Sequence, residues 1–169
     1  DLEYYKATVS EQWYYPLSKN TTLQLTGEFG YAHGMGNKPV PFFKSYYVGG
    51  PGSVRGYRAY SLGPQDAFGN VLGGTRKING SAEVYFPMPG AISDKSLRIT
   101  AFVDAGQVYD AAQTTIGNRD GGGIRTSAGI GFAWSSPFGP LKISLAQPLN
   151  SKKDFDRIER LQLNFGTAF

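Results

Sequence analysis

Gly49-Gly50-Pro51-Gly52-Ser53-Val54-Arg55-Gly56-Tyr57 lies inside a long segment, about residues 33–77, that has neither a strand nor a helix pattern. Glycine and proline interrupt this segment throughout, as they do in turns and loops. A loop of this length is uncommon in a compact domain and is usually functional or disordered. Its centre combines arginine and tyrosine with small residues, which suits a segment that fills a polar cavity. Because strand patterns occur on both sides of it, we expect a wall of strands with this loop folded back against it.

Seven segments alternate apolar and polar residues with a period of two, the pattern of a sheet with one apolar and one polar face. Short turns alternate with longer loops, and each strand is about as long as the ~9–11 residues that a tilted strand needs to cross a bilayer. The pattern predicts an all-β, antiparallel, up-and-down transmembrane β-barrel. The expected strands are about Tyr4–Tyr15, Thr21–Tyr31, Asn79–Phe86, Leu97–Tyr109, Arg125–Ser135, Pro140–Gln147 and Ile158–Phe169.

A soluble β-sandwich or barrel with one buried face is the alternative. Against it, the polar face is rich in small residues, and no charge interrupts the apolar rows of the last five strands. A soluble edge strand usually carries protective charges or proline. Aromatic residues near strand ends would form the girdles of a membrane barrel, at Trp13, Tyr15, Tyr31, Tyr109 and Trp134. We expect lipid to contact the side chains of Leu97, Ile99, Val103, Ile130, Phe132, Leu141, Ile143, Leu145, Leu163 and Phe165.

Composition sets further bounds on the class of protein. The 169 residues suffice for one domain, and no apolar run approaches the ~20 residues of a membrane-spanning helix. The chain has no cysteine, and its net charge of +4 comes from scattered residues, which argues against disulfides and against nucleic-acid binding. Seven up-and-down strands place their two ends on opposite rims, whereas single-chain bacterial barrels have even strand numbers. We therefore expect the C-terminal part of a larger barrel, with both terminal strands as edges open to edge-to-edge association.

The residues offer little support for catalysis or for a bound cofactor. His33 is the only histidine and lies beside no recognisable nucleophile motif. The glycines of residues 49–56 do not match a phosphate-binding loop. The carboxylates Asp104, Asp110, Asp154 and Asp156 lack the spacing of a calcium loop. We expect no enzyme, no catalytic residue, no metal and no cofactor.

One polar constellation remains. Glu83 and Asp104 fall on the polar face of consecutive strands, so they are expected to be neighbours facing one lumen. Arg55 could bind both, because its planar guanidinium matches carboxylates in a bidentate way. Alternatively, the two acids line a wet pore and Arg55 is solvated. The pattern by itself leaves both interpretations open.

Val54-Arg55-Gly56-Tyr57 resembles the VRGF/Y motif of the BamA family of outer-membrane barrel-assembly proteins. The four-residue motif alone would also fit TamA-like proteins and two-partner secretion transporters. A run of Ser-Pro-Phe-Gly-Pro, followed by Ala-Gln-Pro-Leu, is similar to the BamA family more narrowly. Matching stretches run along the whole chain: residues 47–50, 61–64, 81–84, 102–106, 127–129, 135–141, 146–149 and 162–169.

This resemblance implies a 16-stranded barrel of which these are the last seven strands, with loop 33–77 as an extracellular loop tucked into the lumen. It implies that the motif, Val54, Arg55, Gly56 and Tyr57, contacts the wall at Glu83 and Asp104. It also implies a lateral-seam strand that includes Leu161, Leu163, Phe165, Gly166 and Phe169.

The implied function is a non-enzymatic factor that folds and inserts β-barrel proteins into the bacterial outer membrane through that seam. The alternative is a translocation pore of the TamA or two-partner type. The implied partners are the remaining barrel strands, POTRA domains, assembly lipoproteins, nascent outer-membrane proteins and the lipid and lipopolysaccharide of the membrane.

Overall fold

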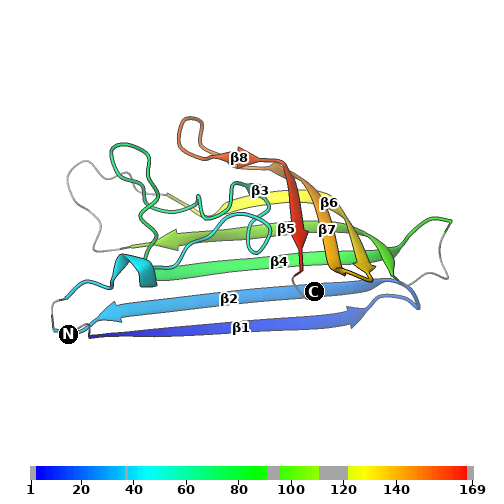
Figure 1. Ribbon diagram of the computed structural model, residues 1–169, viewed down its shortest axis with the longest axis horizontal. Helices are drawn as coiled ribbons and strands as arrows, with labels where there is room; N and C mark the ends of the chain where they lie inside the picture. Colours follow the sequence, from blue (N-terminus) through cyan, green and yellow to red (C-terminus); the bar gives the residue numbers. More distant parts are fainter. Residues whose placement is uncertain (1–2, 37, 91–95, 111–121, 167–169) are drawn as a thin grey trace.

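The computed structural model describes residues 3–36, 38–90, 96–110 and 122–166, and its main element is one seven-stranded sheet (Figure 1). Neighbouring strands are antiparallel throughout, in the order β1-β2-β4-β5-β6-β7-β9. Two short strands, β3 (Gly56–Tyr57) and β8 (Ile158–Glu159), form a separate pair, and η1 (Phe42–Lys44) is one 3-10 turn. The strands of the large sheet are β1 (Tyr4–Pro16), β2 (Thr22–Gly34), β4 (Arg76–Pro87), β5 (Leu97–Tyr109), β6 (Arg125–Ser136), β7 (Gly139–Pro148) and β9 (Leu161–Phe165).

The predicted all-β, up-and-down order is confirmed, with two differences in extent. The first is at the long loop: β2 continues to Gly34 and β4 already begins at Arg76, so the loop comprises residues 35–75 and not 33–77. Backbone pairing, as at Tyr31 with Arg76, holds these ends in the ladder although the apolar/polar alternation of the sequence stops before them. No helix in the described part of the chain is long and apolar enough to cross a membrane.

The second difference concerns the last strand, predicted as one element from Ile158 to Phe169. It is divided at Arg160 into β8, which pairs with β3 in the loop, and β9, which pairs with β7. Gly166 follows β9 with a φ of +79°, a left-handed conformation that ends the strand. Phe169 lies outside the described residues.

The sheet is apolar outside and polar inside, the reverse of a soluble protein. The outward side chains of Val103, Ile130, Leu145 and Leu163 are 52–65% exposed, whereas the inward Asp104 is fully buried. None of the ten side chains predicted to contact lipid is buried. A soluble sandwich, which would bury that apolar face, is therefore contradicted.

Aromatic side chains occupy both ends of the outward face. Trp13 and Tyr15 of β1 are exposed at the end where β1 turns into β2, and Trp134 is at the same end, opposite Leu97. At the other end, Tyr31 and His33 stack and the ring of Tyr5 lies against both. These two bands match the interfacial girdles of membrane barrels.

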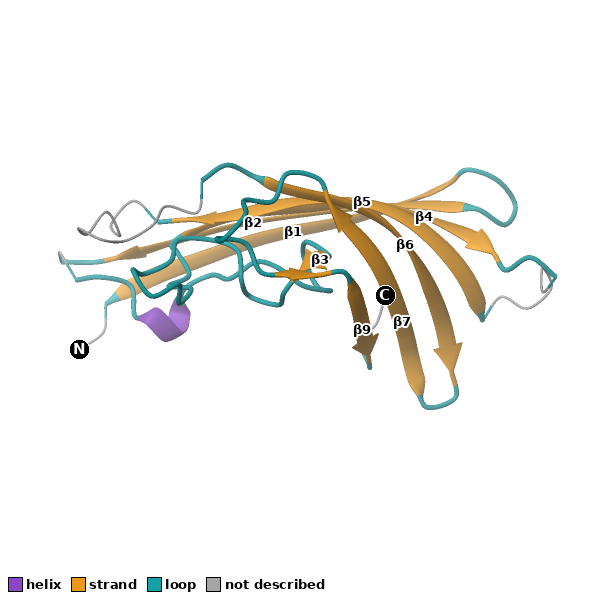
Figure 2. Cartoon of the chain, turned by 90° about the horizontal axis from the view of Figure 1, so that it is seen from above, coloured by secondary structure: helices purple, strands orange, loops and turns teal. Residues whose placement is uncertain are grey.

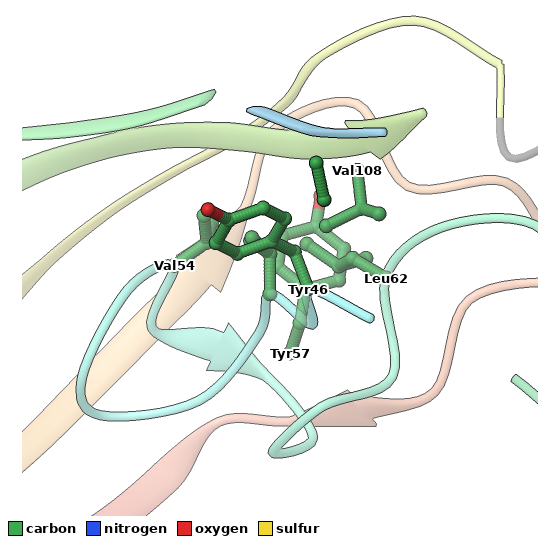
Figure 3. Close-up of a cluster of buried hydrophobic side chains, with 7 residues drawn as sticks. Tyr46, Val54, Tyr57, Leu62 and Val108 are labelled. Atoms are coloured by element: carbon green, nitrogen blue, oxygen red, sulfur yellow. The ribbon is translucent and has the colours of Figure 1, made fainter. Parts of the chain in front are cut away.

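The sheet curls, and loop 35–75 lies against its concave side (Figure 2). The segment has short bridges of its own, such as Val48 with Leu62, which the sequence pattern did not predict. The apolar residues of this segment are irregularly spaced in the sequence, so no periodic pattern predicts that they pack together. They form the buried hydrophobic cluster of Figure 3, with Ala32, Tyr46, Val48, Val54, Tyr57, Leu62 and Val108.

The two terminal strands of the large sheet are its edges, as predicted. In the described part of the chain β1 pairs only with β2, and β9 only with β7, so the sheet does not close on itself.

Candidate functional site

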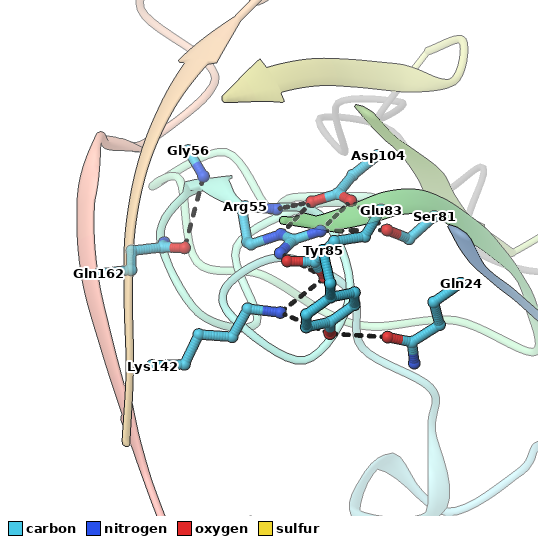
Figure 4. A network of polar contacts seen from close by, with 9 residues as sticks. All are labelled: Gln24, Arg55, Gly56, Ser81, Glu83, Tyr85, Asp104, Lys142 and Gln162. Carbon is cyan, nitrogen blue, oxygen red and sulfur yellow. Dashed lines mark hydrogen bonds and ion pairs between the residues drawn. The ribbon is translucent and has the colours of Figure 1, made fainter. Parts of the chain in front are cut away.

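Arg55 projects from the loop into the inner face of the wall and grips Asp104 of β5 (Figure 4). Its Nε donates a hydrogen bond of 2.7 Å to Oδ2 of Asp104, and its Nη2 donates one of 2.7 Å to Oδ1. The backbone N–H of Arg55 donates a third, 3.0 Å long, to Oδ2. This is the bidentate geometry in which arginine binds a carboxylate most strongly.

The same guanidinium contacts β4. Nη1 of Arg55 lies 3.0 Å from Oε2 of Glu83, and Nη2 donates to Oγ of Ser81 at 3.0 Å. Ser81 in turn donates to Asp104 at 2.6 Å. With 5% of its surface exposed, Arg55 is not solvated, so the ion-pair interpretation of the polar constellation is the one realised.

Lys142 of β7 completes the charge balance, and sequence reasoning did not connect this residue to the cluster. Its Nζ lies 2.6 Å from Oε2 of Glu83, so two cations meet two carboxylates. Lys142 also donates to the hydroxyl of Tyr85 at 3.3 Å, and Tyr85 donates to Gln24 of β2 at 2.7 Å. The network thereby joins strands β2, β4, β5 and β7 through one loop residue.

Phe102 is a second residue that sequence reasoning missed. The guanidinium carbon of Arg55 lies 3.4 Å from the centre of the Phe102 ring, within the range of a cation–π contact. The signal was present, because Phe102 is an aromatic residue on the otherwise polar face, two positions before Asp104.

The electrostatics favour a permanently charged Arg55. Burial by itself disfavours the charged guanidinium, but hydrogen bonds to Asp104 and the charges of Asp104 and Glu83 outweigh it and raise the pKa of Arg55 above its ordinary value. Burial, followed by the charge of Asp156, raises the pKa of Tyr57 to about 12. Both side chains therefore keep their charge state at any physiological pH.

The other motif residues fix the loop to the barrel wall. Val54 and Tyr57 are fully buried in the hydrophobic cluster, and the hydroxyl of Tyr57 donates to the carbonyl of Thr126 at 3.2 Å. Gly56 has a φ of +89°, and a Cβ there would lie 3.1 Å from the Cβ of Ala146. Only glycine suits that combination of conformation and close approach.

The predicted seam residues take two orientations. Leu161, Leu163 and Phe165 point outward and are 62–65% exposed. Gln162, between the first two, points inward and is buried against β3. Gly166 lies just beyond β9 and donates its N–H to Pro140 at 3.0 Å.

The ion pairs and hydrogen bonds of this site attach the loop to the inner face of the sheet. A polar cavity of about 280 Å³ adjoins it, lined by residues that include Gln12, Gln24, Ser53, Arg55 and Glu83. Within the ranges that the structure describes, no three His, Cys, Asp or Glu residues are grouped to hold a metal ion.

An antiparallel sheet with an apolar outer face, an ion-paired inner face and a loop anchored against it is the wall of a membrane-type β-barrel with an inward-folded loop. All 169 residues match the Omp85 superfamily domain. The chain belongs to the Omp85 superfamily.

Its relatives include outer-membrane assembly factors. It is 43% identical to outer membrane protein assembly factor BamA of Neisseria meningitidis serogroup B, over 99% of this chain and 24% of that protein. It is 26% identical to the sorting assembly machinery 50 kDa subunit of Saccharomyces cerevisiae, over 88% of this chain and 32% of that protein. The chain thus spans about a quarter to a third of these relatives.

A solved structure agrees with the fold. The crystal structure of BamA from Haemophilus ducreyi lacking POTRA domains 1–3 superposes with a TM-score of 0.83 at 32% identity. The match covers 95% of this chain and 34% of that one.

Proposed function

We propose that this chain is the C-terminal part of a barrel that folds and inserts β-barrel proteins into the bacterial outer membrane. The observation that carries the proposal is the open edge of β9 beside an outward apolar face. The assembly-factor names of relatives along nearly the whole chain support it. The role is non-enzymatic: the protein supplies a template and no reacting group.

The backbone of β9 has an alternation that suits templating. Ala146 N–H donates to the Arg160 carbonyl at 2.9 Å, and Gly166 N–H donates to Pro140 at 3.0 Å. Residues in hydrogen-bonded and non-hydrogen-bonded positions alternate along an antiparallel ladder. The backbone groups of Leu161, Leu163 and Phe165 are therefore directed to the open edge.

Such an edge is unstable in lipid, where each unsatisfied backbone group costs several kcal/mol. A strand of an incoming protein that pairs with Leu161, Leu163 and Phe165 removes that penalty, by strand addition to a sheet edge. The exposed apolar side chains of the same residues keep the junction at the lipid surface. Strand exchange at the edge thus provides a route for insertion.

The complete barrel is proposed to have 16 strands, with loop 35–75 in its lumen and the motif residues Val54, Arg55, Gly56 and Tyr57 anchored at Glu83 and Asp104. The proposed partners are the remaining strands, POTRA domains, assembly lipoproteins, nascent outer-membrane proteins and a lipopolysaccharide-containing membrane. The POTRA domains are proposed because the crystal structure of BamA from Haemophilus ducreyi is that of a protein lacking POTRA domains 1–3.

Proline at position 163 tests the template. Leu163→Pro removes one backbone N–H from the open edge and leaves in place the hydrogen bonds that the even-numbered residues of β9 form with β7. Leu163→Ala shortens the side chain and keeps the N–H. The full-length protein is reconstituted in liposomes, and insertion of an outer-membrane barrel substrate is followed by protease protection. Heat-modified migration on gels reports that each variant is folded.

We expect insertion to slow strongly for Leu163→Pro and little for Leu163→Ala. Normal insertion by a folded Leu163→Pro protein would overturn the proposal and favour a pore that exports polypeptides through the lumen.

A further inference from the structure

Gln162 in β9 holds the backbone of the loop motif with both ends of its side-chain amide. Its Nε2 donates to the carbonyl of Tyr57 at 2.7 Å. Its Oε1 accepts from the N–H of Gly56 at 3.4 Å (Figure 4). The side chain is 4% exposed. An amide that donates and accepts in this way imitates one rung of a β-ladder between the last strand and the loop.

Directly beyond this contact, the chain itself pairs with the loop. β8 lies antiparallel to β3, with Tyr57 opposite Ile158, and Arg58 N–H donates to the Arg157 carbonyl at 2.8 Å. The Arg160 carbonyl still accepts from Ala146 of β7. The final strand therefore changes partner at Arg160, from β7 to the loop.

The connection before β8 is tied to the same loop. Gln65 Nε2 donates to the Phe155 carbonyl at 3.0 Å, and Arg157 Nη2 donates to the Gly69 carbonyl at 2.9 Å. The loop and the last connection thus touch at several points besides Gln162.

The wall contact and the seam contact come from consecutive loop residues. Arg55 binds Glu83 and Asp104 in β4 and β5, and the next two residues bind Gln162 in β9. Residues 55–57 therefore form a strut across the concave side of the sheet. The ladder between β7 and β9 is short, with pairs from Leu141–Phe165 to Leu145–Leu161, and Gln162 gives the seam strand a second attachment, to the loop.

We propose that Gln162 is a positioning residue that couples the stability of the seam strand to the anchoring of Arg55. Loosening Arg55 then loosens β9 chiefly through Gln162, because the other loop contacts reach β8 and the connection before it. The consequence for insertion rests on the proposed function, but the coupling itself exists without a substrate.

A double-mutant cycle tests the coupling in the full-length protein in lipid nanodiscs. Hydrogen–deuterium exchange is measured for the Asn164 amide, which belongs to β9 and pairs with Lys142 of β7. The variants are Arg55→Lys, Gln162→Leu and both together. Gln147→Leu is the matched control, because Gln147 is exposed on β7 and its amide donates to the carbonyl of its neighbour Pro148.

Arg55→Lys and Gln162→Leu should each speed exchange at Asn164 about tenfold, and the double variant should exceed Gln162→Leu by about twofold at most, as for coupled sites. Gln147→Leu should leave exchange unchanged. If the Arg55→Lys variant fails to fold, Asp104→Asn replaces it. If the Gln162→Leu variant fails to fold, Gln162→Glu replaces it.

The coupling would be overturned if the two increases in the exchange rate of Asn164 multiplied in the double variant. It would also be overturned if Arg55→Lys changed exchange only within loop 35–75. Because exchange is measured without substrate, that result leaves the insertion assay of Leu163→Pro to decide the proposed function separately.

Discussion

A Cβ atom on Gly106 would lie 2.8 Å from Cγ2 of Val54, so the wall lacks a side chain where the loop motif inserts one. The Cβ would also meet Asn79 at 2.8 Å and the Ile78 carbonyl at 3.0 Å. Gly106 is two residues beyond Asp104, the main partner of Arg55. The motif therefore packs against the wall at Gly106 through Val54, and it is ion-paired with the wall at Asp104 through Arg55.

Gly106→Ala should destabilise the docked loop by about 1–3 kcal/mol, the usual cost of overpacking a filled interior. Gly27→Ala is the control, because a Cβ at Gly27 in β2 would have no neighbour within 4 Å. Urea unfolding of the full-length protein in lipid vesicles measures both. Equal midpoints for the two variants would show that the loop does not pack against Gly106.

Removing the cation should be more severe. Arg55→Ala leaves Asp104 buried without its partner, which costs about 3–5 kcal/mol for a broken buried pair. The temperature at which the full-length barrel unfolds, followed by its change of mobility on gels, should be lower. Arg58→Ala, which removes an exposed arginine three residues further along the loop, should leave the transition unchanged. Wild-type heat resistance of Arg55→Ala would contradict the structural role of the ion pair.

Phe102→Leu tests the ring beneath Arg55. The change keeps an apolar side chain but removes the cation–π contact, which is worth about 2 kcal/mol when the pair is desolvated. Phe132→Leu, on the outward face of β6, offers the same chemical change, and no cation–π contact involves Phe132 among the residues that the structure describes. We expect a lower urea midpoint for Phe102→Leu than for Phe132→Leu, and identical midpoints would refute the contact.

Gly56→Ala should displace β3 from β7, because alanine at a φ of +89° is strained and its Cβ meets Ala146 at 3.1 Å and Pro148 at 3.3 Å. The left-handed backbone alone costs about 1–2 kcal/mol. Gly52→Ala lies in the same loop with no neighbour within 4 Å and no positive φ, so it should be tolerated. Limited proteolysis of the loop compares the two, and equal resistance to cleavage would refute the prediction.

The outward face can be tested with a charge. Ile143→Arg, in the middle of β7, should cost about 2–4 kcal/mol if that position lies at mid-membrane. Leu149→Arg, in the exposed loop after β7, should cost little. Unfolding in vesicles distinguishes them. A well-tolerated Ile143→Arg would mean that this face does not contact hydrocarbon.

Much of the fold was determined by the sequence alone. Period-two alternation fixed which face of each strand is apolar, because side chains of a strand point to opposite faces in turn. That parity put Glu83 and Asp104 on one inner face and Leu163 on the outer one. The motif around Arg55 then indicated the loop that faces them, and the structure contains the contact.

Tertiary structure alone decided the rest. Lys142 and Phe102 lie far from Arg55 in the sequence, and only the folded sheet brings Lys142 to Glu83 and Phe102 to the guanidinium of Arg55. The apolar residues of loop 35–75 have no period, so their cluster exists only once the chain folds back on itself. The division of the last strand at Arg160 has the same origin, because its pairing partner, β3, lies about a hundred residues earlier in the chain. Periodicity records which way a side chain points, but a three-dimensional structure is needed to show what it meets.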